Sequence, residues 1–74
     1  MTNKINGKEA AAMTLKQLRK RAGLTQKEAA ARIGITARNL RRWENQGGMK
    51  ITLASLYRLA VVYGIDFQSW FDAM

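Results

Sequence analysis

The sequence contains no cysteine and no proline, it has few acidic residues, and it lacks any long hydrophobic run. Without cysteine the chain can form neither a disulfide nor a thiolate metal site, so its composition is indifferent to the redox compartment. No stretch approaches the roughly 20 apolar residues that a membrane-spanning helix needs, and the N-terminus has no signal-peptide hydrophobic region. The absence of proline and of sustained period-two alternation predicts an all-α protein with the cytoplasm as its expected location.

Histidine is absent as well, and the chain has no glycine-rich phosphate loop. The five carboxylates are scattered among expected helix caps and one buried position. The sequence therefore predicts no catalytic residue, no metal site and no cofactor. An enzyme is the least favoured class of function.

Basic charge is what the chain has in excess. Its 74 residues give room for one domain with a modest core, and 47% apolar residues exclude a disordered chain. The net charge is +8, and the segment 16–42 holds one acid, Glu28, and nine bases: Lys16, Arg19, Lys20, Arg21, Lys27, Arg32, Arg38, Arg41 and Arg42. Such a field attracts polyanions. A basic membrane-surface helix is the competing interpretation, which is disfavoured because such helices are usually long and uninterrupted.

Residues 25–44 have the pattern of two short helices joined by a tight turn. Thr25 and Glu28 form a capping box at the start of the first helix, and Gly34 suits the left-handed conformation that ends it. Thr36 caps the second helix, 36–44. Small or apolar side chains recur on the inner sides: Ala29, Ala30, Ile33, Ile35, Leu40 and Trp43. This pattern predicts a helix-turn-helix motif, whose second helix enters a DNA major groove.

The outward side of this second helix is basic. At about 100° per residue, Arg38 and Arg42 project almost opposite Leu40, and Asn39 and Arg41 flank them. Arginine and asparagine carry the donors that base edges and phosphates accept. A solvated charged face is the plainer interpretation, and the complete turn pattern beside it favours contact with DNA.

The rest of the chain predicts an arm and three further helices, five helices in all. Residues 1–13 lack apolar periodicity, which predicts a flexible N-terminal arm with at most a frayed turn at 9–12; the domain is 14–74. The other expected elements are a helix at 15–22 capped by Thr14 and Gln17, a flexible break at 45–48, a helix at 52–63 capped by Thr52, and a short helix capped by Asp66. The inner side of the helix at 52–63 is expected to comprise Leu53, Leu56, Leu59, Ala60 and Tyr63.

The C-terminal segment is rich in aromatic residues for the edge of so small a core. Phe67, Trp70 and Phe71 lie within five residues of each other. In one interpretation they seal the bottom of the core. In the other, these three and Met74 leave an apolar patch for a second subunit.

Two charged residues fall on helix sides that are otherwise apolar. Arg19 lies about 40° from Leu15 on the first predicted helix, and Glu44 lies about 40° from Leu40. A lone charge at either position would be desolvated without compensation, so each requires the other nearby. The sequence predicts a buried or half-buried ion pair that fixes the angle of the second motif helix.

From about Thr14 to Phe71 the chain resembles the lambda-repressor and Cro-like helix-turn-helix family. The resemblance lies in LKQLRKRAGLTQKEAAARIGI, in RRWENQGG and in ITLASLYRLAVVYGIDFQSWF. Ile51 departs from it, because relatives often have proline there. The family implies a compact five-helix DNA-binding domain with the motif at its second and third helices.

The resemblance also implies roles for individual residues. Base edges or sugars would be contacted by Thr36, Ala37, Arg38 and Arg42, with at most an apolar contact to a thymine methyl from Ala37. The DNA backbone would be contacted by Gln26, Asn39, Arg41 and Asn45. Relatives commonly bind pseudo-palindromic operators as dimers whose half-sites are about 10 bp apart. A weak homodimer on double-stranded DNA is therefore expected.

The resemblance leaves two candidate functions. The first is a sequence-specific transcriptional regulator, most like a stand-alone Cro-type repressor or a prophage or plasmid switch protein. The alternative is an antitoxin or accessory interaction module, which would use the same fold mainly to hold a protein partner through Phe67, Trp70 and Phe71.

Overall fold

A computed structural model describes residues 4–46 and 51–74. Within these residues the chain forms helices and one isolated bridge, and no strand. The helices are α1 (Gly7–Ala11), α2 (Leu15–Arg21), α3 (Gln26–Ile33), α4 (Ala37–Asn45), α5 (Leu53–Tyr63) and α6 (Phe67–Ala73). The predicted all-α class is confirmed. Helices α2 to α6 are the five predicted ones, and α1 precedes them.

Local sequence explains where the helices begin. Thr14 with Gln17, and Thr25 with Glu28, form complete capping boxes at α2 and α3. Thr36 and Thr52 each accept one backbone N–H at the starts of α4 and α5. Asp66 stands at the N-cap of α6 but makes no side-chain capping bond, which differs from its predicted role. The predicted break at 45–48 falls partly outside the described residues: Asn45 ends α4, and Gln46 is its C-cap.

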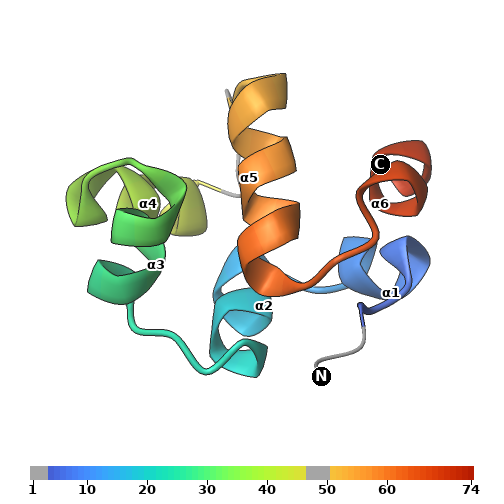
Figure 1. Ribbon diagram of the computed structural model, residues 1–74, viewed down its shortest axis with the longest axis horizontal. Helices are drawn as coiled ribbons and strands as arrows, with labels where there is room; N and C mark the ends of the chain where they lie inside the picture. The colour runs from blue at the N-terminus through green and yellow to red at the C-terminus, as the bar shows by residue number, and fades with distance from the viewer. Residues whose placement is uncertain (1–3, 47–50) are drawn as a thin grey trace.

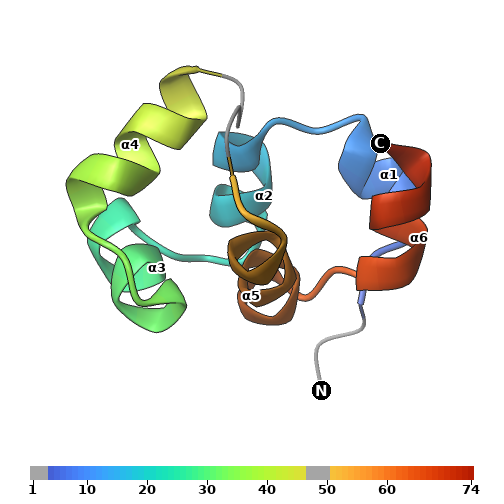
Figure 2. The same ribbon diagram turned by 90° about the horizontal axis from the view of Figure 1, so that it is seen from above.

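Helix α5 stands at the centre of the molecule. Figure 1 shows it between the α3–α4 pair on one side and the α1–α6 pair on the other, and the view from above in Figure 2 agrees. The largest fully buried side chains come from four helices and the segment after α5: Leu18, Ile33, Leu40, Leu59, Tyr63 and Ile65. These side chains hold the helix-turn-helix against α2 and α5. No helix among the described residues is both long enough and apolar enough to cross a membrane.

Residues 5–11 differ from the predicted flexible arm. The backbone N–H of Ile5 donates to the Gly64 carbonyl at 2.9 Å, and the N–H of Asp66 donates to the Ile5 carbonyl at 3.1 Å. Ile5 is therefore a buried bridge partner of Ile65. Helix α1 follows and packs on α6. At Gly7 the two backbones approach so closely that an added Cβ would overlap the Trp70 backbone nitrogen.

The contact with α1 removes Trp70 from the surface. Trp70 is only 4% exposed and belongs to the same core cluster as Ala10 of α1. The prediction that Trp70 contributes to a dimer surface is wrong, because that surface was inferred without a helix covering α6. Leu53, predicted on the inner side of α5, is 60% exposed, since it lies in the first turn beyond the edge of the core.

Candidate nucleic-acid interface

The turn between α3 and α4 is closed by backbone bonds and by one side chain from α5. Gly34 adopts φ 89°, in the left-handed region, and its N–H donates to the Ala30 carbonyl at 2.9 Å. The N–H of Ile35 donates to the same carbonyl at 3.0 Å. The guanidinium of Arg58 donates to the Ile33 carbonyl at 3.3 Å, which ties the turn to α5. Sequence analysis did not identify this contact, because Arg58 lies 25 residues away.

The inner side of α4 anchors it against α3 and the core. Leu40 is fully buried, and Trp43 is half-buried against the core cluster. Ala30 on α3 is buried, and its small side chain permits the close crossing. Ala37 is half-buried against the core, so only part of its methyl group remains available to a base edge.

The outer side of α4 is exposed and carries the predicted polar residues. Arg38, Asn39, Arg41 and Arg42 are all exposed, and so is Asn45 at the end of the helix. Thr36 is exposed too, but its hydroxyl already accepts the N–H of Asn39 at 3.1 Å. Because the hydroxyl still has its own hydrogen and a second lone pair, capping does not prevent a further contact. The structure thus assembles the predicted face on one helix, held by apolar contacts on the other side.

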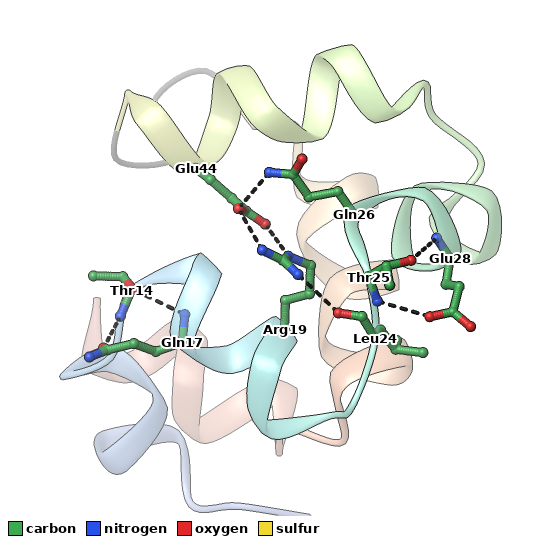
Figure 3. Close-up of polar contacts among 8 residues, drawn as sticks. All are labelled: Thr14, Gln17, Arg19, Leu24, Thr25, Gln26, Glu28 and Glu44. Carbon is green, nitrogen blue, oxygen red and sulfur yellow. Dashed lines mark hydrogen bonds and ion pairs between the residues drawn. The ribbon is translucent and has the colours of Figure 1, made fainter.

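Arg19 and Glu44 meet beneath this helix, as the sequence predicts (Figure 3). Nε of Arg19 lies 2.7 Å from Oε2 of Glu44, and Nη2 donates to Oε1 at 3.3 Å. The side chains are 8% and 2% exposed. The hydrogen bond to Glu44 raises the pKa of Arg19 more than burial lowers it, so the guanidinium stays charged in the folded protein.

Two further residues complete this network, and sequence analysis did not identify either contact. Nη1 of Arg19 donates to the Leu24 carbonyl at 2.9 Å, and Nε2 of Gln26 donates to Oε1 of Glu44 at 3.1 Å. Gln26 is the first residue of α3, so the network joins α2, the loop after it, the start of α3 and the end of α4 (Figure 3). Bonds to a carboxylate on α4 therefore connect this helix to α2 and to the start of α3.

The network also orients the side chain of Gln26. One N–H of its amide is directed at Glu44, and a primary amide has a second N–H and a carbonyl oxygen. Gln26 is half-buried, and Figure 3 shows its amide oxygen directed away from Glu44. A half-buried amide held in this way is suited to donate to a phosphate oxygen beside the recognition helix.

The predicted dimer residues are not equally accessible. Phe67 is half-buried, Phe71 is 44% exposed and Met74 is 63% exposed, while Trp70 is buried. Sequence analysis did not identify Tyr57 or Val61, which are exposed on α5. Their spacing of four residues was the available signal, but it was masked by the apolar character of the whole helix.

Comparison with protein families identifies a helix-turn-helix family whose sequence profile matches residues 15–70, the stretch from the start of α2 to Trp70 in α6. Comparison with the curated proteins and with the solved structures gives no match.

Proposed function

The chain belongs to the Cro/C1-type helix-turn-helix family, a DNA-binding family, and we propose that it is a sequence-specific transcriptional regulator with α4 in the major groove. The observation that carries the proposal is the exposed face of Arg38, Asn39, Arg41 and Arg42, opposite a buried Leu40. Three guanidinium groups on one short helix repel each other in isolation. Their placement is favourable when a polyanion neutralises them.

The proposed contacts divide into two classes. Arg38 and Arg42, which helical spacing places almost opposite Leu40, would read base edges, with Thr36 and the accessible part of Ala37 beside them. The remaining polar residues, Gln26, Asn39, Arg41 and Asn45, would hold the sugar-phosphate backbone. Gln26 would use the N–H that it does not donate to Glu44.

The finer proposals rest on the family resemblance. They are a Cro-like repressor of the type found in prophage or plasmid switches, acting on cytoplasmic DNA and binding a pseudo-palindromic operator as a weak homodimer. The alternative, an antitoxin or accessory module, would hold a protein partner through α6. Burial of Trp70 removes the largest of the three aromatic residues on which that alternative relied.

Replacing Arg38 with alanine tests base readout. The Arg38→Ala variant should bind a selected cognate duplex about 1–3 kcal/mol more weakly, with little change on random duplex DNA. Gln26→Ala should instead weaken both alike, because a phosphate contact carries no sequence information. The measurement is a set of binding isotherms at one fixed salt concentration, with sites obtained by selection from a random library.

Lys8→Ala is the matched control, because it removes one positive charge from α1, on the opposite side of the molecule from α4 (Figure 1). It should leave discrimination between sequences unchanged. Equal losses on cognate and random DNA for Arg38→Ala would reduce Arg38 to a backbone contact. Failure of the unmodified protein to bind any duplex would overturn the proposed function.

A further inference from the structure

Among the asparagines of the chain, Asn6 alone is followed by glycine. The backbone nitrogen of the next residue can attack an asparagine side chain, and glycine allows this attack most readily because it has no Cβ to obstruct the approach. Asn6 is exposed to solvent. The dipeptide therefore has the chemistry for spontaneous deamidation, and the surrounding structure determines when the reaction can occur.

The folded chain keeps the two reacting groups apart. The Gly7 N–H, which would have to lose its proton, donates to Ser69 Oγ at 2.8 Å. The side chain of Asn6 is held as well, because its Oδ1 accepts the N–H of Lys8 at 2.8 Å. Asn6 has an extended ψ of 139°, which turns the Gly7 nitrogen away from the side-chain Cγ. A five-membered ring between this nitrogen and Cγ cannot close while α1 is packed on α6.

We propose that Asn6 is a deamidation site that reacts only when α1 detaches from α6. In the detached segment hydroxide removes the proton of the Gly7 amide, and the nitrogen attacks Cγ of Asn6. The new N–Cγ bond forms as the bond from Cγ to Nδ2 breaks, and the side-chain nitrogen takes a proton from water and leaves as ammonia. Water then opens the resulting succinimide at one of its two carbonyl carbons, which gives aspartate or isoaspartate.

The two products differ in whether α1 can dock again. Before position 6, the chain is anchored by the two backbone bonds between Ile5 and the segment 64–66. After position 6, it is anchored by the bond from Gly7 to Ser69. Isoaspartate adds one methylene group to the main chain between these anchors, so both cannot be satisfied together. Aspartate keeps the length of the main chain and caps a helix as asparagine does, so α1 docks again.

The site is tested by incubating the full chain at mildly alkaline pH and identifying the products by peptide mapping and isoaspartyl methyltransferase labelling. A peptide of residues 4–9 gives the rate of the undocked segment. Asn6 should react at least about tenfold more slowly in the chain than in the peptide, because α1 must first open. Equal rates would show that docking does not control the reaction. An Asn6 that stays unmodified in the chain even in denaturing urea would show that it is no deamidation site.

Ser69→Ala tests whether the contact between α1 and α6 controls the rate. It removes the acceptor of the Gly7 N–H and should accelerate deamidation in the chain about fivefold, which corresponds to the net contribution of one hydrogen bond. Ser55→Ala is the matched control, because it makes the same change on α5 at a hydroxyl that bonds Thr52. It should leave the rate unchanged. No acceleration by Ser69→Ala, or equal acceleration by both variants, would overturn the proposal.

Comparison of the two products separates the length of the main chain from its charge. The purified isoaspartyl chain should exchange the Ile5 amide hydrogen faster than the unmodified chain, because this amide is bonded only while the segment is docked. Asn6→Asp has the same added charge on an ordinary main chain and should exchange like the unmodified protein. Faster exchange in Asn6→Asp, or unchanged exchange in the isoaspartyl chain, would contradict the predicted difference. None of these measurements involves DNA, so their failure leaves the proposed function untouched.

Discussion

At the scale of single residues, the position of α4 depends on the pair formed by Arg19 and Glu44. Glu44→Ala would leave the guanidinium of Arg19 buried without its carboxylate, at an expected loss of about 3–5 kcal/mol in the free energy of unfolding. Replacing both residues with methionine or leucine should cost much less, because neither charge then remains buried. Denaturant unfolding of the single and double variants measures the difference. A double variant as unstable as Glu44→Ala would contradict this account.

The two capping boxes predict a pH dependence at α3 that α2 does not share, because α2 uses Gln17 where α3 uses Glu28. The hydrogen bond from the Thr25 N–H, at 2.9 Å, lowers the pKa of Glu28 below its ordinary value of 4.5. Since the folded protein has the lower pKa, the carboxylate's contribution to stability is complete above pH 4.5. It is lost as the pH falls through the folded pKa.

Glu28→Gln should keep the capping box, as Gln17 does in α2, and should remove this part of the acid dependence. Urea unfolding from neutral pH into the acid range measures it. Glu9→Gln, an exposed carboxylate on α1 outside any capping box, is the matched control. The explanation fails if Glu28→Gln and Glu9→Gln lose the same amount of stability as the pH falls.

The sequence predicted the Arg19–Glu44 pair because each charge lies on an otherwise apolar helix side and therefore needs a partner. It did not predict contacts that depend on how other segments of the chain fold. The bonds of Arg19 to the Leu24 carbonyl and of Gln26 to Glu44 depend on where the loop after α2 runs. Helical spacing contains no information about that path. The burial of Trp70 was not predicted for the same reason, because nothing in its own segment reveals that α1 covers it.

At the scale of elements, the sequence located α2 to α6 because each has a cap or an apolar periodicity of its own. Helix α1 has only five residues and begins with glycine, so it is too short to be stable alone. Its one local signal was Asn6, whose side chain accepts the N–H of Lys8 at 2.8 Å. The rest of its support comes from α6, some 60 residues away, through the bond from the Gly7 N–H to Ser69 Oγ at 2.8 Å.

Gly7→Ala tests whether this packing exists in solution. The added methyl group would overlap the backbone of Ser69 and Trp70, which cannot move aside as a flexible side chain would. Loss of close packing between α1 and α6 should lower the free energy of unfolding by about 1–3 kcal/mol. Hydrogen exchange at the Ile5 and Trp70 amides should become faster. An unchanged stability and exchange rate would support the flexible arm that the sequence predicts for residues 1–13.

At the scale of the whole molecule, the basic outer side of α4 and the apolar side chains exposed on α5 and at the C-terminal end occupy different parts of the fold. The helix-turn-helix lies on one side of α5, and α6 lies on the other (Figure 2). Under the proposed function, DNA would engage α4 while a second copy engages the exposed apolar side chains. The two associations should therefore differ in salt dependence, steep for DNA and shallow for the dimer.

The separation of these surfaces predicts how two copies respond to the spacing of half-sites. Half-sites about 10 bp apart present themselves on the same side of the duplex, where two copies could meet through α5. An insertion of about 5 bp, half a helical turn, would place them on opposite sides. Each half-site should still bind one copy, but cooperativity between the copies should disappear.

Binding isotherms on three duplexes test this expectation: one half-site, two half-sites in the selected spacing, and two with the insertion. Only the second should bind cooperatively. Val61→Asp should make the second duplex behave like the third while leaving affinity for one half-site unchanged, because Val61 lies on α5 and outside the α4 surface. Cooperativity that survives both the insertion and Val61→Asp would mean that the copies communicate through DNA and not through the exposed apolar side chains of α5.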